Sequence, residues 1–300
     1  MANGYVWTRQ SCPTCGDKPK KLLGRRGGAA HPAGYGVETK VWRCASCGLI
    51  FPDPMPFPAG GLGQHYDLAA DDYFQVHDKS EKLVTADGLV SQAEQFIGGT
   101  GRLLDVGVGR GEVMLKAKER GWDVEGIEPS QTFADYAEQS VGVRIWRVPV
   151  EDAEIPSESF DVVILAAVLE HLYNPDAVIA SIARVLKPGG LLFLDVPNEA
   201  GLYFTMGNLY HKLRGRDWCT NLAPTFSPFH VFGFSQRSIG HLLSKHGLRP
   251  KVSKVYAGRS VVPARNGVLG WVERVGSIAV TAVSNLGNMG TYIEIWAEKV

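Results

Sequence analysis

Short apolar runs alternate with amphipathic stretches from about residue 101 onward. The apolar runs predict strands at 102–106, 122–128, 143–148, 160–168, 190–196 and 291–300. Between them, helical spacing of apolar residues together with cap and glycine signals predicts helices at 111–121, 130–140, 174–190 and 235–247. Strands that alternate with helices pair in parallel through right-handed crossovers. The pattern therefore predicts an α/β fold with a doubly wound, Rossmann-like sheet.

Two further segments do not follow this alternation. A partly helical pattern at about 78–97 predicts a helix before the first strand of the sheet. Residues 197–234 are rich in aromatic residues, proline and asparagine, which predicts an insertion, at about 199–230, that forms a lid or a ligand pocket. The aromatic side chains of this insertion are Tyr203, Phe204, Tyr210, Trp218 and Phe226, and Tyr66 and Tyr73 from the region before the sheet could close over a bound ligand. Core packing is the alternative for each of these side chains.

The first 56 residues carry two cysteine pairs with identical spacing. Their members are Cys12 with Cys15 and Cys44 with Cys47, and a glycine follows each pair. A CxxC turn directs two thiolates at one point, so the two pairs predict a tetrahedral Zn²⁺ site with four cysteine ligands. Four thiolates leave no open position, which favours a structural zinc ribbon. A redox pair or a degenerate site is the alternative.

Composition and charge limit the classes of partner. The 300 residues are 45% hydrophobic and 21% charged, as in an ordinary globular protein. Lysine plus arginine and aspartate plus glutamate both number 31, so no overall positive field attracts nucleic acid. The uncharged stretch 275–293 contains too many polar residues for a membrane span. No secretory signal opens the chain, and reduced cysteines fit the cytoplasm, where we expect the protein.

These observations predict three parts of the chain. Residues 1–56 would form the zinc ribbon, 57–100 a helical linker or cap, and 101–300 the Rossmann-like domain with its insertion.

The first strand of the predicted sheet runs directly into a glycine-rich loop. In RLLDVGVGRGEV, Gly107, Gly109 and Gly111 follow Asp105 at alternate positions. Ligands of open α/β sheets bind outside the C-terminal ends of the strands, and glycine lets a ligand approach the main chain. The loop is therefore predicted to bind a ligand; tight packing of strand against helix is the alternative.

Acidic residues around this loop argue against a phosphate ligand. The dinucleotide fingerprint needs a glycine where this chain has Glu112, and an anion at a helix start repels a pyrophosphate. The loop suits a ligand with a cationic end, such as S-adenosylmethionine, which has an ammonium, a sulfonium and no phosphate. Glu128, after the second strand, would bind the two ribose hydroxyls. Asp152, after the third, would accept a hydrogen bond from the adenine amino group.

Four stretches of the sequence support the prediction of an S-adenosylmethionine site: LLDVGVGRG, VEGIEPS, VEDAEIPSESFDVVILAAVLEHLYNP and VLKPGGLLFLDVPN. They resemble, in order and spacing, the motifs of class I S-adenosylmethionine-dependent methyltransferases over roughly residues 80–255. The resemblance implies methyl transfer to a small molecule. It also implies a binding site in which Asp105, Gly107, Gly109 and Gly111 surround the methionine part, Glu128 binds the ribose, and Asp152 with Ala153 binds the adenine.

Two histidines are candidates for catalysis. His171 follows the fourth strand of the sheet, where the resemblance places a residue that faces the methyl group, and His230 lies at the end of the insertion. Either could act as a general base on a hydroxyl acceptor. A loop-tethering role for His171 and a substrate-shaping role for His230 are the alternatives.

Three functions remain open on this basis. The first is O-methylation of a sugar, a glycan or a secondary metabolite. The second is C-methylation of a nucleotide-linked keto-sugar. The third is a non-enzymatic zinc-ribbon protein that binds nucleic acid or protein; the neutral charge and the intact glycine loop argue against it. No nucleic acid partner is expected, and the oligomeric state is not predicted.

Overall fold

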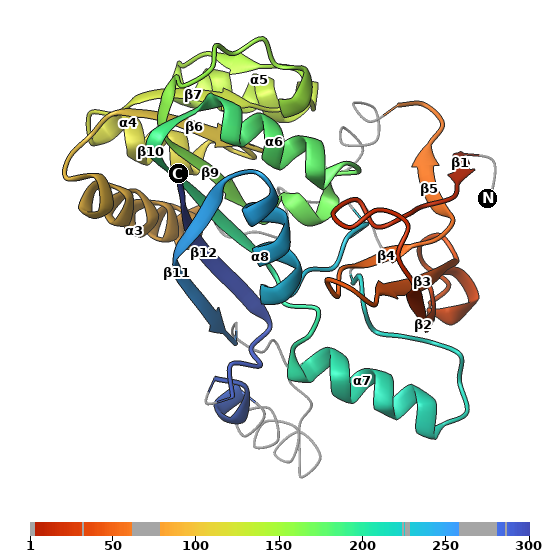
Figure 1. The fold of residues 1–300 in the computed structure, drawn as a ribbon. Coiled ribbons are helices and arrows are strands. Elements are labelled where there is room, and N and C mark those ends of the chain that lie inside the picture. Colours follow the sequence, from red (N-terminus) through yellow and green to blue (C-terminus); the bar gives the residue numbers. More distant parts are fainter. Residues whose placement is uncertain are drawn as a thin grey trace, which may run out of the picture.

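The central element of the computed structural model is one mixed sheet (Figure 1). Its strands, in spatial order β11-β12-β10-β9-β6-β7-β8, are parallel from β10 to β8, whereas β12 runs antiparallel to both β10 and β11. In chain order these strands are β6 (Arg102–Val106), β7 (Asp123–Ile127), β8 (Ile145–Trp146), β9 (Phe160–Ala166), β10 (Leu186–Pro197), β11 (Leu248–Tyr256) and β12 (Tyr292–Lys299). The predicted doubly wound, Rossmann-like sheet is confirmed.

The structure describes residues 4–31, 33–61, 79–223, 225, 229–257, 281–285 and 287–300. Three of the aromatic residues expected around the pocket, Tyr66, Tyr73 and Phe226, lie outside these ranges. Within the described ranges, no helix is both long and apolar enough to span a bilayer.

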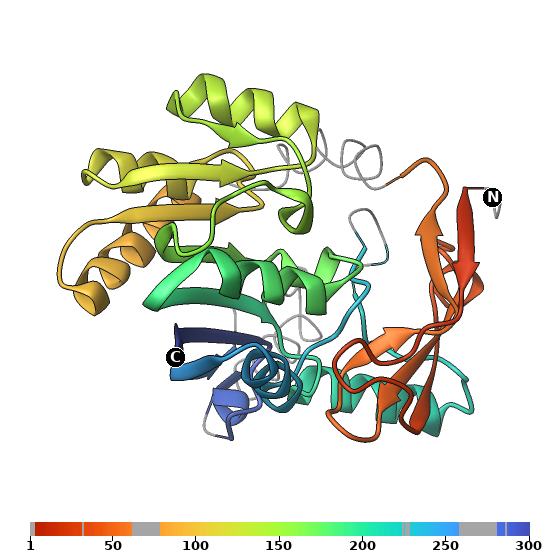
Figure 2. The same cartoon turned by 45° about the horizontal axis from the view of Figure 1, so that its top comes forward.

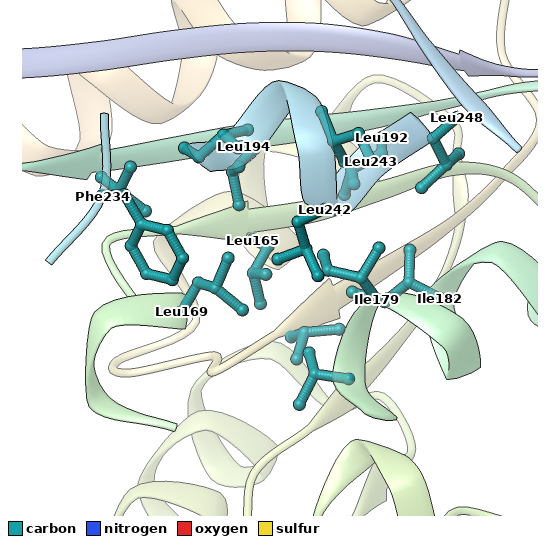
Figure 3. Packing of buried hydrophobic residues seen from close by; sticks show 14 of the residues in the cluster. Leu165, Leu169, Ile179, Ile182, Leu192, Leu194, Phe234, Leu242, Leu243 and Leu248 are labelled. Atoms are coloured by element: carbon teal, nitrogen blue, oxygen red, sulfur yellow. The ribbon is translucent and has the colours of Figure 1, made fainter. Parts of the chain in front are cut away.

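Helices cover both faces of the sheet (Figure 2). On one face lie α3 (Lys79–Ile97), α4 (Glu112–Glu119) and α5 (Gln131–Val141); on the other lie α6 (Pro175–Val185) and α8 (Gln236–Lys245). Successive strand residues alternate between the two cores, so that Leu103 packs toward α3 and α4 and Leu104 toward α6. Figure 3 shows the second core, where Ile179 and Ile182 of α6 meet Leu242 of α8.

The order of the strands creates a crevice at one edge of the sheet. From β6 the chain continues to β7 and β8 on one side, and then returns to β9 on the other side of β6. Strand order therefore reverses between β6 and β9, and their C-terminal ends border the crevice in which open α/β sheets bind ligands.

The N-terminal residues form a separate small sheet. It contains β2 (Lys20–Arg26), β3 (Thr39–Cys44) and β4 (Ile50–Pro52), and beside it β1 (Tyr5–Thr8) pairs with β5 (Met55–Pro58). A single 3-10 turn, η1 (Gly28–Ala30), follows β2. Strand β5 runs across the boundary expected at residue 56.

Asp217, Cys219 and Gly233 contact this small sheet, the ribbon, and lie in the segment between strands β10 and β11 of the large sheet. Ile50 of β4 and Gly233 exchange two backbone hydrogen bonds of 2.9 and 2.8 Å. On the opposite edge, the Arg25 N–H donates to the Asp217 carbonyl (2.9 Å) and the Cys219 N–H donates to the Arg25 carbonyl (3.0 Å). Both outer strands of the ribbon are therefore covered, which removes exposed strand edges.

Two predicted elements differ in the structure, and one strand was not predicted. The helix expected at 174–190 ends at Val185, and residues 186–190 begin β10, because Pro188 cannot continue a helix and disfavours helical backbone in the residue before it. The strand expected at 143–148 is only Ile145–Trp146. Strand β11 was not predicted, because its largely exposed sequence LRPKVSKVY lacks an apolar run.

The insertion contains a helix that the sequence pattern did not predict, α7 (Leu202–Leu213). It lies beside the ribbon (Figure 1). Tyr203 and Tyr210 on this helix are more than half exposed, whereas Phe204 is buried. Phe204 therefore packs in the protein interior, and a role of the exposed Tyr203 and Tyr210 in a lid stays a prediction.

Two helical glycines make a matched test of the contact between α7 and the rest of the insertion. A Cβ at Gly207 would lie 2.5 Å from Thr220 Cγ2, and the Thr220 hydroxyl is already held by Asn208. A Cβ at Gly240 of α8 would meet nothing within 4 Å. We expect Gly207→Ala to lower the free energy of unfolding by about 1–3 kcal/mol through overpacking. Gly240→Ala should raise it by roughly 0.5–1 kcal/mol.

Urea denaturation of both variants provides the measurement. Equal stabilisation by the two alanines would show that α7 does not pack closely on Thr220.

Candidate active site

The glycine loop follows β6 at the crevice, and its backbone has a conformation that favours glycine. Gly107, Gly109 and Gly111 have φ angles of 77°, 53° and 81°, all in the left-handed region. A Cβ at Gly107 would lie 2.5 Å from the side chain of Val168, which follows β9. The loop after β6 therefore touches the segment after β9, as the reversal of strand order requires.

Three acidic side chains surround this loop. Asp105, Glu112 and Glu128 are each less than 9% exposed. Burial, followed by the charges of Glu112 and Glu128, raises the pKa of Asp105 well above its usual value. One oxygen of Glu112, Oε1, is buried without a hydrogen-bond partner in the described part of the chain. The surroundings of the glycine loop are therefore strongly acidic, and they suit a cation better than an anion.

The remaining two residues expected at the nucleoside follow β8. Asp152 ends the 3-10 turn η2 (Val150–Asp152) and is exposed, whereas Ala153 is buried. Glu128 follows β7, and its Oε1 accepts a hydrogen bond of 2.9 Å from the Ser130 N–H. The expected residues thus lie at or after the C-terminal ends of three neighbouring strands, β6, β7 and β8.

The two candidate histidines lie next to each other in the structure. In the sequence they are far apart, since His171 and the residue before His230, Phe229, are 58 positions apart. Their ring centroids are 4.8 Å apart at an interplanar angle of 68°. His171 lies on the 3-10 turn η3 (Leu169–His171) after β9, and its Nδ1 donates to the Phe229 carbonyl at 3.0 Å. Burial, then the neighbouring His171 and Arg26, lowers the pKa of His230 well below its usual value, so that His230 is neutral.

A buried carboxyl beside these histidines was missed as a site residue. Glu170 is 2% exposed, and burial, then the charges of Asp195 and Glu199, raises its pKa to about 8. In the sequence Glu170 stands directly before His171, and no pattern there indicated a role of its own. Its burial depends on the insertion packing over it, so no local pattern could have revealed it.

Glu199 is a second missed residue, and it connects the ribbon to the sheet. Its carboxylate accepts hydrogen bonds from the Asn221 side chain (2.8 Å) and from the Leu222 N–H (3.0 and 3.1 Å). Burial raises its pKa to about 7, while these bonds and the charges of Arg26 and Arg43 act in the opposite direction. The ribbon therefore places two positive charges next to a buried acid at the start of the insertion, two residues after β10 ends.

The four N-terminal cysteines gather at one point. Their sulfur atoms lie within 4.8 Å of one another, and Cys12 Sγ is 3.6 Å from Cys47 Sγ. Tetrahedral Zn²⁺ with Zn–S bonds of about 2.3 Å requires sulfur separations of about 3.8 Å. Gly16 and Gly48 close the two knuckles with φ angles of 71° and 84°. The donor set and its spacing therefore fit Zn²⁺.

The family of the chain follows from comparison with known proteins. Residues 80–252, more than half of the chain, match the family of methyltransferase domains. This chain belongs to that family, as the glycine loop and the strand order indicate.

Curated relatives are similar over a shorter stretch. Identity is 41% over 104 residues with a ubiquinone biosynthesis O-methyltransferase of Hahella chejuensis, covering 33% of this chain and 44% of that protein. With the ubiquinone biosynthesis O-methyltransferase of Agrobacterium fabrum it is 34% over 103 residues, covering 33% and 41%. The match spans less than half of the length of these relatives.

A solved structure shares the fold. The S-adenosylmethionine-dependent methyltransferase of Thermotoga maritima, described as a possible histamine N-methyltransferase, aligns with a TM-score of 0.52 and 19% identity. The alignment covers 80% of this chain and all of that one. At this identity the likeness concerns the fold alone.

Substitution of one cluster cysteine tests the metal site. We expect Cys44→Ser to release zinc, because a hydroxyl is a poor replacement for a thiolate ligand, and to lower the melting temperature. Atomic absorption measures the zinc content. The matched control is Cys219→Ala, a buried cysteine outside the cluster, which should retain zinc. Full zinc content in Cys44→Ser would contradict the site.

The raised pKa of Glu199 predicts a pH-dependent stability. The folded state binds a proton more tightly than the unfolded state, so stability falls as pH rises from about 4.5 to about 7. Relative to Glu199→Gln, the wild type should lose about 3 kcal/mol over this window. Urea denaturation at pH 5 and pH 8 measures the difference. A stability gap between the two proteins that stays constant with pH would contradict the buried acid.

Proposed function

We propose that this protein transfers a methyl group from S-adenosylmethionine to an oxygen atom of a small-molecule acceptor. The observation that carries the proposal is the buried acidic edge around the glycine loop, at the crevice of a methyltransferase-family sheet. S-adenosylmethionine supplies a methyl group activated by a sulfonium. Its cationic end and its lack of phosphate fit this edge, where a nucleotide phosphate would be repelled.

The residue roles follow from the arrangement at the strand ends. Asp105 and the loop glycines Gly107, Gly109 and Gly111 would hold the methionine part. Glu128 would accept hydrogen bonds from the ribose hydroxyls, and Asp152 with Ala153 would hold the adenine. Zn²⁺ bound by Cys12, Cys15, Cys44 and Cys47 would have a structural role, because four protein ligands leave no open position.

The acceptor would lie at the histidine pair. His171 and His230 meet beside the loop that follows β9, which contacts the glycine loop through Val168. A neutral histidine there can promote loss of the acceptor's hydroxyl proton. The names of the curated relatives support oxygen as the acceptor atom. Sugars, glycans and secondary metabolites with a free hydroxyl are the proposed acceptors.

Cofactor binding is the most direct test. We expect Asp105→Asn and Glu128→Gln each to weaken binding of S-adenosylmethionine by about 10- to 100-fold, the value of a charged hydrogen bond. Isothermal titration calorimetry measures the affinity. Asp123→Asn is the control, because this exposed acid of β7 pairs with Arg102 away from the crevice. Wild-type affinity in both site variants would refute the proposed site.

Methyl transfer is then followed by mass spectrometry with a panel of sugar nucleotides, glycans and phenols. A product methylated on oxygen would support the proposal, and one methylated on carbon would favour the keto-sugar alternative. Absence of S-adenosylmethionine binding together with RNA binding would favour a non-enzymatic role.

A further inference from the structure

Three potential metal ligands meet where the insertion packs on the end of β9. Glu170, His171 and His230 each offer one ligand atom, and these atoms lie within 4.8 Å of one another. Two of the residues are adjacent on η3, and the third comes from the end of the insertion. This histidine–carboxylate cluster is distinct from the cysteine cluster in both residues and donor chemistry.

Backbone contacts hold the cluster together independently of any ligand. The N–H groups of Val231 and Phe232 both donate to the Glu170 carbonyl, at 2.8 and 3.1 Å. On the other side, the Arg26 guanidinium donates to the His230 carbonyl at 3.2 Å. The main chain on both sides of the contact is therefore fixed, which is the preorganisation that a metal site needs.

The hydrogen bonds also define the ligand atom of His171. A carbonyl oxygen only accepts, so the contact with Phe229 requires a proton on His171 Nδ1. The neutral ring then carries its lone pair on Nε2. Metal-binding histidines typically donate their second ring N–H to a carbonyl or carboxylate in this way, which orients the ring.

Two further atoms of the cluster are buried without a partner. In the described ranges, neither Glu170 Oε2 nor His230 Nδ1 has a hydrogen-bond partner. Leaving such a group unsatisfied destabilises the folded protein. Glu170 Oε2 and His230 Nδ1 can both bind a metal ion, and His171 beside them is oriented as a metal ligand. Together they indicate that a bound species supplies the missing partners.

The surrounding charge favours a cation. Burial raises the pKa of Glu170 most, and the charges of Asp195 and Glu199 add to it, so two further carboxyl groups act on this one. Arg26, which donates to the His230 carbonyl, is itself acted on by the charge of Glu199. His230 is neutral, which is the form that coordinates metals.

We propose that Glu170, His171 and His230 form a second metal site, specific for a divalent transition metal such as Fe²⁺, Mn²⁺, Co²⁺ or Zn²⁺. Two imidazoles and one carboxylate are the donor set of sites that keep open coordination positions. If the proposed function holds, an acceptor hydroxyl would occupy an open position, and the metal would lower the pKa of that hydroxyl so that its proton passes to solvent water. The alkoxide would then form the new O–C bond as the S–C bond of S-adenosylmethionine breaks, with S-adenosylhomocysteine as the leaving group. The two histidines then act as ligands rather than as general bases.

A metal titration of the full-length, zinc-loaded protein tests the site without cofactor or acceptor. Mn²⁺ and Co²⁺ are the probes, because oxygen and nitrogen ligands accept them whereas thiolates select zinc. Mn²⁺ binding is followed by loss of the free-ion electron paramagnetic resonance signal. Co²⁺ binding is followed by visible absorption without thiolate charge-transfer bands. We expect one bound ion per chain in addition to zinc.

Variants assign the ion to the cluster. Glu170→Gln and His230→Ala should each weaken binding at least tenfold, and His241→Ala, an exposed histidine of α8, should leave it unchanged. His230→Gln is the substitute if the alanine variant unfolds. Failure of both probes to bind the wild type, or wild-type affinity in both cluster variants, would overturn the metal site.

Affinity for S-adenosylmethionine, measured separately, distinguishes the two proposals. Metal binding by a protein that does not bind S-adenosylmethionine would support the metal site and contradict the proposed function. Retained S-adenosylmethionine binding in a variant that has lost the metal would show that its fold is intact and that the loss is local.

Discussion

The backbone contacts of residues 229–233 are the constraint on which the site depends. This short segment pairs with Ile50 of the ribbon through Gly233, and two of its N–H groups donate to the Glu170 carbonyl. It therefore joins the ribbon, the insertion and the end of β9 at one point. Because backbone hydrogen bonds have strict geometry, these contacts bring the His230 ring to within 4.8 Å of the His171 ring, centroid to centroid. The ribbon is thus part of the support of the site.

Buried charge is the second organising feature. Asp105 at the glycine loop, Glu170 at the histidines and Glu199 at the ribbon are all buried acids with raised pKa values. Only Glu199 has ribbon arginines close enough to offset its charge. Burying carboxylates destabilises the folded protein, so such groups are concentrated where a ligand offsets the cost. In this protein the two other acids lie at the proposed cofactor site and the proposed metal site.

Much of the fold was predictable because its strands are covered on both faces. The run 160–168 is almost wholly apolar, and the helices carry clear caps, such as Asn174, whose side chain accepts from the Ala177 N–H. The edge strand β11 was missed for the opposite reason: it is exposed, so burial imposes no pattern on it. The helix α7 was missed because its apolar residues are scattered and several are exposed.

The sequence by itself determined the parallel sheet, the glycine loop with Asp105, and the two CxxC knuckles. Each of these depends on residues close together in the chain, where spacing and backbone preference act directly. Only the tertiary structure decided that His230 meets His171, that Glu170 becomes a buried acid, and that the insertion covers both edges of the ribbon. Those contacts join segments about 60 to 200 residues apart, and their geometry comes from packing of whole elements, which leaves no local periodicity in the chain.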